Sequence, residues 1–169
     1  YLYQLGLKLG VDDLSEYYGL CGFGKRVGID LPSESPGLNP NSEWYDRNYG
    51  KNKWTRGLVL NNAIGQGEVL STPLQLAQFF CGLAQQDGVV YRPHLVARIL
   101  RPDGRVDNLT PHESFRLPFS SATLDALREG LRAVVEGEHG TAKGLRTPDY
   151  SIGGKTGTAE IPNLESGGY

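Results

Sequence analysis

The sequence predicts a mixed α/β (α+β) fold built as one domain, and three observations support this prediction. A length of 169 residues fits a single domain. Hydrophobic residues make up 38 % of the chain and charged residues 21 %, which allows a core and excludes wholesale disorder. Segments with the apolar spacing of helices alternate with short runs of β-forming residues, so we expect both kinds of element.

Two helices are predicted at the start of the chain. Residues 1–9 are apolar with helical spacing, and Gly10 ends this segment. Asp13 and Glu16 have the spacing of a capping box, which predicts the start of a second short helix. Two glycines, at positions 22 and 24, then close that helix, because glycine readily takes the left-handed conformation found at helix ends.

A long polar loop is predicted to follow. Val27–Leu31 is a short β-like run that stops at Pro32. Residues 32–53 are rich in Pro, Ser, Asn and Gly, which predicts a surface excursion with little regular structure. Two roles stay open for the aromatic residues of this region: local packing that holds the loop, or a wall for substrate. These residues are Trp44, Tyr45, Tyr49 and Trp54.

The clearest helix signals lie near the middle of the chain. Thr72 suits the N-cap, Pro73 suits the first helical position, and Gln75 completes a capping box. We expect this helix to end near Gln86. Its buried face is predicted from residues at i, i+3, i+4 and i+7, which are Leu76, Phe79, Phe80 and Leu83.

A small hairpin is predicted after this helix. Residues 89–100 contain several β-forming residues and lead into the turn Pro102-Asp103-Gly104. Arg105-Val106 is then expected to return as the second strand. Turn residues between two β-forming runs are typical of a hairpin.

A further helix and a strand are predicted in the last third. Ser121 is the expected cap of a helix that runs to about Glu136. One helical turn is expected within residues 141–145, and Tyr150–Ile161 is predicted to be a β-strand. The inner side of the helix is predicted to carry Leu124, Leu127, Leu131, Val134 and Val135.

Two blocks of sequence carry a resemblance to a known family. One is Asn62–Ala77, which contains Gly-Gln-Gly-Glu and Ser-Thr-Pro, and the other is Lys155–Glu160, which reads Lys-Thr-Gly-Thr-Ala-Glu. Together they closely resemble the transpeptidase domain of class B penicillin-binding proteins. Tyr3–Gly10 and Gly28–Pro32 resemble the elongation-type members, often called penicillin-binding protein 2. The resemblance covers nearly all of the chain.

The resemblance implies roles for four residues of the second block. Lys155 and Thr158 are implied as catalytic residues, and Lys155, Thr156, Gly157 and Thr158 as substrate-binding residues. Lys155 would supply a fixed cation that supports proton movement, and the two threonine hydroxyl groups would hold the substrate's carboxylate. Gly157 has no Cβ, so a substrate can lie close against the strand. The N–H of Thr158 would form half of the oxyanion hole.

The same resemblance implies the fold and the reaction. The family has the penicillin-binding/β-lactamase-like transpeptidase fold, an antiparallel sheet flanked by helices, and we expect this chain to be incomplete at both ends of that fold. The implied activity is that of a peptidoglycan D,D-transpeptidase, which crosslinks cell-wall stem peptides by serine acyl transfer and is acylated by β-lactams. No metal or organic cofactor is implied.

The implied partners are those of the cell wall. They are the stem peptide ending in D-Ala-D-Ala, β-lactams, and a membrane glycosyltransferase of the cell-elongation machinery. The implied location is the outer, periplasmic face of the plasma membrane, with an anchor upstream of this chain. Nucleic acid is not expected, because the net charge is −2 and the charged residues are scattered.

Histidines and cysteines give little further signal. His94, His112 and His139 lack the spacing of metal ligands. Cys21 and Cys81 leave two interpretations open, a disulfide in an oxidising compartment or two separately placed thiols.

The family's nucleophile is absent from the sequence. No serine has a lysine three residues on, as Ser-x-x-Lys requires, and none has Asn or Asp two residues on, as the second motif requires. In the family, that second motif lies just before a helix that resembles Tyr1–Leu9. We therefore expect residues 1–169 to be a partial transpeptidase domain, which begins just after the second motif and ends just after the Lys-Thr-Gly strand.

Two other functions stay open from the sequence. A serine β-lactamase shares the Lys-Thr-Gly strand, although the Gly-Gln-Gly block and the loop-rich region 30–60 argue against it. A non-catalytic β-lactam sensor or scaffold would have lost Ser-x-x-Lys from the parent sequence. The deacylation rate of a penicilloyl adduct separates the enzymes, because transpeptidases deacylate slowly and β-lactamases rapidly.

The isolated 169-residue chain is predicted to form no covalent adduct with penicillin. No serine has a lysine one helical turn away, and an unactivated hydroxyl is a poor nucleophile at neutral pH. Mass spectrometry of the purified chain, after incubation with a fluorescent penicillin, measures this directly. A stoichiometric adduct linked to a serine would show that the nucleophile lies within this chain.

Overall fold

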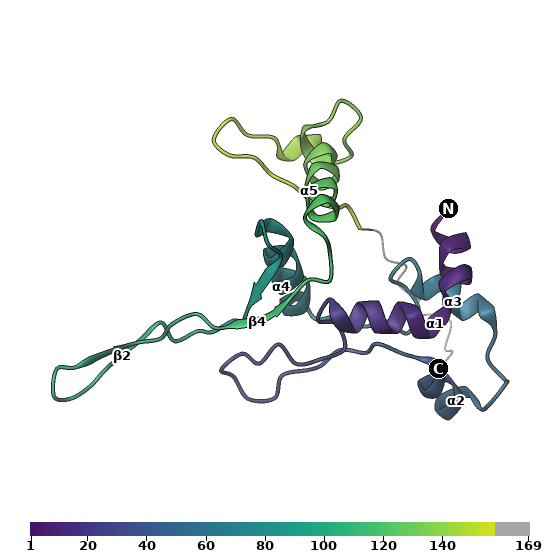
Figure 1. Ribbon diagram of the computed structural model, residues 1–169, viewed down its shortest axis with the longest axis horizontal. Helices are drawn as coiled ribbons and strands as arrows, with labels where there is room; N and C mark the ends of the chain where they lie inside the picture. Colours follow the sequence, from purple (N-terminus) through teal and green to yellow (C-terminus); the bar gives the residue numbers. More distant parts are fainter. Residues whose placement is uncertain (158–169) are drawn as a thin grey trace, which may run out of the picture. The chain divides into compact units, whose positions relative to one another are not determined.

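The structure is a computed structural model that describes residues 1–157. The chain divides into two compact units, Tyr1–Leu124 and Asp125–Tyr169. Helices and small antiparallel sheets occur together (Figure 1), which confirms the predicted mixed fold. In chain order the elements are α1 (Leu2–Leu20), α2 (Ser42–Tyr49), α3 (Arg56–Asn62), α4 (Pro73–Ala84), β1 (Val89–Tyr91), β2 (Arg98–Leu100), β3 (Val106–Asn108), β4 (Glu113–Arg116), α5 (Ser121–Glu136) and the 3₁₀ turn η1 (Lys143–Leu145).

Helix α1 contains the predicted break and ends in a standard cap. Gly10 has φ 81° and ψ 173°, so two helical segments meet there at a kink. At the C-terminal end, Gly22 has φ 93° and donates its N–H to Gly19 O at 3.2 Å. The N–H of Phe23 donates to Tyr18 O at 3.0 Å, which completes a Schellman motif. The prediction that glycines close this helix is confirmed.

Helix α2 lies inside the region predicted to be irregular, so that prediction is wrong for Ser42–Tyr49. Asn41 is the N-cap, and its side chain accepts the N–H of Trp44 at 2.9 Å. Tyr45 is fully buried and holds one face of the helix in the interior. A local cap and one buried aromatic face therefore outweigh the loop-like composition of the surrounding sequence.

No strand forms at Val27–Leu31, which corrects the β-like prediction. Side chains take up the backbone groups that a neighbouring strand would bind. The carboxylate of Glu34 accepts the N–H groups of Val27 and Gly28, at 2.5 and 2.9 Å. The guanidinium of Arg92 donates to Gly28 O. The segment is thus held as a loop.

The predicted capping box of α4 is confirmed. The hydroxyl of Thr72 accepts the N–H of Gln75, and the side chain of Gln75 accepts the N–H of Thr72. Gln75 is only 2 % exposed, and its amide also donates to Lys25 O at 2.7 Å and Pro36 O at 2.8 Å. One side chain therefore caps α4 and holds two distant loop segments.

The buried face of α4 was predicted only in part. Leu83 is buried, but Leu76 and Phe80 are 42 % and 38 % exposed. Gln75 and Gln78 lie in the interior instead, and the amide of Gln78 donates to a backbone carbonyl of β1 at 3.1 Å. Apolar periodicity does not reveal which side of a helix faces unpaired carbonyl groups, so it misassigned this face.

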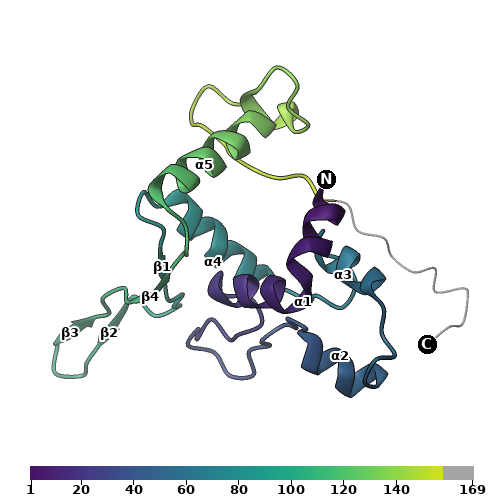
Figure 2. The same cartoon turned by 45° about the vertical axis from the view of Figure 1, so that its right-hand side comes forward.

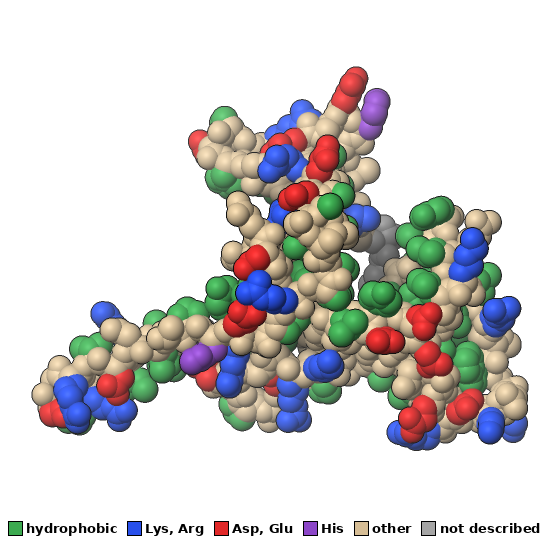
Figure 3. Space-filling view, in the orientation of Figure 1, with side chains coloured by type: hydrophobic (Ala, Val, Ile, Leu, Met, Phe, Trp, Pro, Cys, Tyr) green, Lys and Arg blue, Asp and Glu red, His purple; other side chains and the backbone are tan. Residues whose placement is uncertain are grey.

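Two small antiparallel sheets follow α4 (Figure 2). The predicted hairpin is confirmed, since β2 pairs with β3 from Arg98 opposite Asn108 to Leu100 opposite Val106. The pairing of β1 with β4 was not predicted. Figure 3 shows basic and acidic side chains together at the tip of the hairpin, where two ion pairs form at 2.7 Å. These surface pairs contribute little to stability.

The last predicted helix and the helical turn after it are confirmed, but the cap of the helix lies one residue earlier than predicted. Helix α5 has the expected bounds, but its cap is Ser120, whose hydroxyl accepts the N–H of Thr123 at 3.2 Å. The expected helical turn is η1. Leu124 and Val135 are each 1 % exposed, whereas Leu127 is 38 % exposed and lies outside the inner side.

Replacing Gln75 by leucine should destabilise the fold strongly. The change removes the hydrogen bonds to the carbonyl groups of Lys25 and Pro36, and each such bond contributes about 1 kcal/mol net. We expect Gln75→Leu to lower the free energy of unfolding by about 2 kcal/mol or more in urea titrations. The exposed Gln86→Leu is the matched control. Equal stability of the two variants would contradict the assigned role of Gln75.

Candidate functional site

The structure describes three of the four predicted site residues. Lys155, Thr156 and Gly157 are all exposed, and Thr158 lies outside the described residues. The ammonium of Lys155 donates to Thr156 O at 2.6 Å. The hydroxyl groups of Thr156 and Thr141 are 3.4 Å apart, so the site segment meets the turn that follows α5. These polar groups are therefore open to a ligand from solvent.

The strand predicted for Tyr150–Ile161 is absent from residues 150–157, so the prediction is wrong there. Its last four residues lie outside the described range. A strand requires a neighbouring strand as hydrogen-bond partner. Here Gly154 instead donates its N–H to Leu131 O of α5 at 2.9 Å, and the Ser151 hydroxyl donates to Glu136 of the same helix. The segment lies along a helix rather than in a sheet.

The Gly-Gln-Gly block forms a tight turn directly after α3. Gly65 and Gly67 have φ of 71° and 74°, in the left-handed region that favours glycine. The carbonyl of Asn61 accepts the N–H groups of Ile64 at 3.1 Å and Gln66 at 2.9 Å. The two glycines therefore let the backbone make this tight turn. This turn belongs to the first unit, whereas Lys155 belongs to the second.

Glu68 holds this turn against α2. Its carboxylate accepts the hydroxyl of Tyr45 at 2.9 Å and the hydroxyl of Tyr49 at 2.7 Å. The Tyr45 hydroxyl also lies 3.2 Å from Oδ1 of Asn62, a residue that is 2 % exposed. Tyr18 of α1 donates to Asn62 O at 2.7 Å. Three helices therefore meet in one hydrogen-bonded network beside the Gly-Gln-Gly turn.

The aromatic residues of the 44–54 region pack against one another, which is one of the two roles predicted for them. Tyr45 stacks on Trp54 with ring centroids 5.2 Å apart and meets Trp44 edge-on at 5.1 Å. Together with Val11 and Val59, Tyr45 forms the buried cluster between α1, α2 and α3. A role of this cluster in substrate contact stays a prediction.

Both tyrosines at Glu68 have a pKa above the ordinary value for tyrosine. Burial raises the pKa of Tyr45, and its hydrogen bond with Glu68 raises it further. For Tyr49 the hydrogen bond with Glu68 is the larger cause of a raised pKa, and burial is the smaller one. Ionisation would turn each donor into an anion beside a carboxylate, so the network favours neutral phenols.

The two cysteines are free thiols. Cys21 is buried at the end of α1 and Cys81 is exposed on α4. Burial raises the pKa of Cys21 to about 11, so this thiol is neutral and unreactive at neutral pH. Within residues 1–157, no three His, Cys, Asp or Glu side chains gather as metal ligands, and no helix has the length and apolarity to cross a membrane.

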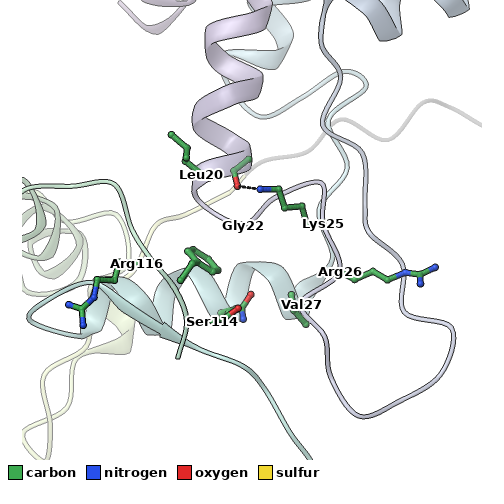
Figure 4. Close-up of a pocket in the computed structure, with 10 residues that line it drawn as sticks. Leu20, Gly22, Lys25, Arg26, Val27, Ser114 and Arg116 are labelled. Carbon is green, nitrogen blue, oxygen red and sulfur yellow. Dashed lines mark hydrogen bonds between the residues drawn. The ribbon is translucent and has the colours of Figure 1, made fainter. Parts of the chain in front are cut away.

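A hollow of about 340 Å³ lies in the first unit between the end of α1 and β4. In Figure 4, Arg26 and Arg116 extend away from each other on opposite sides of it. Arg116 is paired with Glu113 at 3.0 Å, and Lys25 donates to a backbone carbonyl at 3.0 Å. The hollow thus lacks the convergent polar groups of a ligand site. Its lining is Gly19, Leu20, Gly22, Lys25, Arg26, Val27, Gln78, Ser114, Phe115 and Arg116.

Sequence reasoning missed two sets of structural supports, one in each unit. The first is the pair of tyrosines that bind Glu68. Tyr45 and Tyr49 are four residues apart, so helical spacing could have placed both on one face. The second is Arg146, which binds the end of α5. No local pattern signals that role, because its partners lie in another element.

Known proteins are similar to this chain over nearly its whole length. The family model described as "Penicillin binding protein transpeptidase domain" matches residues 1–169. "Peptidoglycan D,D-transpeptidase MrdA" of Acinetobacter baumannii is 36 % identical over 171 residues, which covers 99 % of this chain and 24 % of that relative. The chain thus spans about a quarter of the length of the curated relatives it matches.

Two solved structures are similar to the chain as well. The complex between penicillin-binding protein PBP2 and MreC from Helicobacter pylori matches with a TM-score of 0.76 and 31 % identity, over 95 % of this chain and 28 % of that one. PBP2 of Pseudomonas aeruginosa in complex with WCK 5153 matches with a TM-score of 0.69 and 34 % identity, over 85 % of this chain and 32 % of that one.

Tyr45→Phe should change how stability depends on alkaline pH. The pKa of Tyr45 is raised above its ordinary 10.0 on folding, so its contribution is present below about pH 10 and is lost as pH rises beyond that. We expect the variant to be less stable at pH 8, and to lose less stability than the unmodified chain between about pH 10 and 12. Thermal unfolding followed by circular dichroism measures both effects.

The exposed Tyr150→Phe serves as the control for this pH series. Its stability should follow that of the unmodified chain at every pH. Parallel curves for Tyr45→Phe and the unmodified chain would mean that the Tyr45 hydroxyl does not hold the network.

Proposed function

Because the chain belongs to the penicillin-binding protein transpeptidase domain family, we propose that it is part of an elongation-type peptidoglycan D,D-transpeptidase. One observation carries the proposal: the Gly-Gln-Gly block at 65–67 and the Lys-Thr-Gly block at 155–157 occur in one chain that matches the family throughout. Relatives named as D,D-transpeptidases at 32–36 % identity support this activity over a β-lactamase or a non-catalytic sensor.

The proposed reaction is a two-step acyl transfer. A serine of the parent protein, outside this chain, attacks the carbonyl of the penultimate D-Ala. Its Oγ–C bond forms, the C–N bond to the terminal D-Ala breaks, and that D-Ala leaves with the proton on its amine. An amine of a neighbouring stem peptide then attacks the ester, which forms the crosslink and returns a proton to the serine.

The residues of the Lys-Thr-Gly block are assigned roles in this reaction. Lys155 supports proton movement at the serine and attracts the substrate's carboxylate, and Thr156 and Thr158 donate hydroxyl hydrogen bonds to that carboxylate. The Thr158 N–H stabilises the oxyanion of the tetrahedral intermediate. Gly157 lets the substrate lie close to the backbone. The exposure of Lys155 and Thr156 supports these roles, because a ligand can reach both side chains.

The proposal includes the surroundings of the parent protein. Residues 1–169 form a partial transpeptidase domain, and the catalytic serine lies elsewhere in a longer chain. The parent is anchored by an upstream segment and acts on the outer, periplasmic face of the plasma membrane. It binds stem peptides and β-lactams and works with a membrane glycosyltransferase. The Helicobacter pylori relative, whose structure includes MreC, supports the expectation that the parent works within an assembly.

Lys155→Ala in the parent enzyme should slow acylation by a fluorescent penicillin by roughly 10²–10³-fold, the typical loss when one preorganised electrostatic group is removed. Lys155→Arg should also be impaired, because the planar guanidinium fills the site differently from an ammonium. Stopped-flow measurement of the acylation rate checks both.

The exposed Lys51→Ala is the matched control, since it removes the same charge from a loop of the first unit. Its acylation rate should equal that of the unmodified enzyme. Rates within threefold of normal for both Lys155 variants would remove Lys155 from the mechanism.

A further inference from the structure

Helix α5 is closed by a side chain from beyond the helix. The last four C=O groups of an α-helix lack donors within the helix. Arg146 supplies three hydrogen bonds at this end: Nε donates to Val135 O at 2.8 Å, and Nη2 donates to Glu136 O at 2.6 Å and Gly137 O at 2.8 Å. Its positive charge also complements the negative end of the helix dipole. The position of the guanidinium is thereby set by three successive carbonyls.

The chain returns along α5 from this anchor. The Ser151 hydroxyl binds the side chain of Glu136. Gly154, the residue directly before Lys155, binds the carbonyl of Leu131. These two hydrogen bonds, three residues apart on the return segment, hold it against α5. Figures 1 and 2 both show it passing alongside α5.

Close packing limits the return segment further. A Cβ added at Gly153 would lie 3.3 Å from Cβ and 3.4 Å from the carbonyl carbon of Leu131. These distances are at the short limit for carbon contacts, so the glycine lets the backbone lie directly on the helix. Lys155 follows two residues later, and its backbone position is thus set by contacts with α5.

The turn between α5 and η1 also contacts the Lys-Thr-Gly segment. Ala142 donates its N–H to Val134 O at 2.9 Å, and a Cβ at Gly140 would lie only 2.4 Å from that same carbonyl oxygen. The turn is therefore held tightly against the helix end. It carries Thr141, whose hydroxyl meets that of Thr156. Arg146 comes after this turn and before the return segment, so it joins the two.

We propose that Arg146 is a positioning residue for the Lys-Thr-Gly site. It binds the C-terminal carbonyls of α5 and so sets the start of the segment that places Lys155 and Thr156 for acyl transfer. Arg146 itself does not contact the substrate. The inference rests on the proposed function of Lys155, because it concerns how that residue is held.

A double-mutant cycle in the full-length parent enzyme tests this inference. The variants are Arg146→Gln, Lys155→Ala and the double variant. Stopped-flow kinetics separate the rate constant of acylation from the binding of penicillin that precedes it. Arg146→Gln should slow acylation by roughly 10- to 100-fold, because small misplacements of catalytic groups carry losses of this size. In the Lys155→Ala background the same change should add less than about threefold, because Arg146 acts through Lys155.

Two further variants separate positioning from general stability. Arg146→Lys should recover part of the rate, because an ammonium can still donate to the carbonyls but lacks the planar fork. Gly153→Ala leaves Arg146 intact but pushes the return segment away from Leu131, so it should slow acylation as well. This second variant decides the matter if Arg146→Gln fails to fold, as judged by thermal unfolding.

Arg132→Gln is the matched control on the same helix. The Arg132 side chain is 63 % exposed and lies 4.0 Å from Glu136, so its loss should leave acylation unchanged. Normal acylation by folded Arg146→Gln would overturn the inference. So would a double variant whose loss of rate equals the product of the losses in the two single variants, because the residues would then act independently. Normal acylation by Lys155→Ala alone would overturn the proposed role of Lys155 as well, and that result needs no Arg146 variant.

Discussion

Backbone N–H and C=O groups outside helices and strands need hydrogen-bond partners, and in this chain long polar side chains supply many of them. In the first unit, Gln75 binds backbone groups of three segments and Glu34 accepts two N–H groups. In the second unit, Arg146 donates to three carbonyls at the end of α5. The strands of the described part have only three or four residues, so these side chains hold the loops in place.

Side-chain hydrogen bonds also hold the two sequence blocks that identify the family. The Gly-Gln-Gly turn is held by the Glu68 carboxylate, which binds two tyrosines of α2. The Lys-Thr-Gly segment is held against α5 by the hydrogen bond of Gly154. Earlier in the chain, Arg146 binds the C-terminal end of the same helix. In each unit the block that resembles the family is exposed or lies in a turn, and buried or charge-assisted contacts nearby set its position. Rigid support beneath accessible groups is what preorganised catalysis requires.

Features with local determinants were predictable from the sequence, and features with distant partners were not. The Thr72 capping box, the kink at Gly10 and the β2–β3 hairpin all depend on residues within a few positions, and all were predicted correctly. The interior face of α4 was misassigned because Gln75 finds its partners 39 and 50 residues away. The strand expected around Lys155 failed similarly, since its backbone partner proved to be a helix. Motif chemistry identified the candidate residues, but only the structure revealed what holds them.

We propose that α5 presents Lys155 and Thr156 to the carboxylate of a substrate or β-lactam. A crystal structure of the complete parent enzyme acylated by a β-lactam tests it most directly. We predict that the Arg146 guanidinium keeps its bonds to the end of α5, and that the side chains of Lys155 and Thr156 lie within about 3.5 Å of the ligand's carboxylate or of the serine that it acylates. A carboxylate bound elsewhere, with Arg146 released from the helix, would contradict the account.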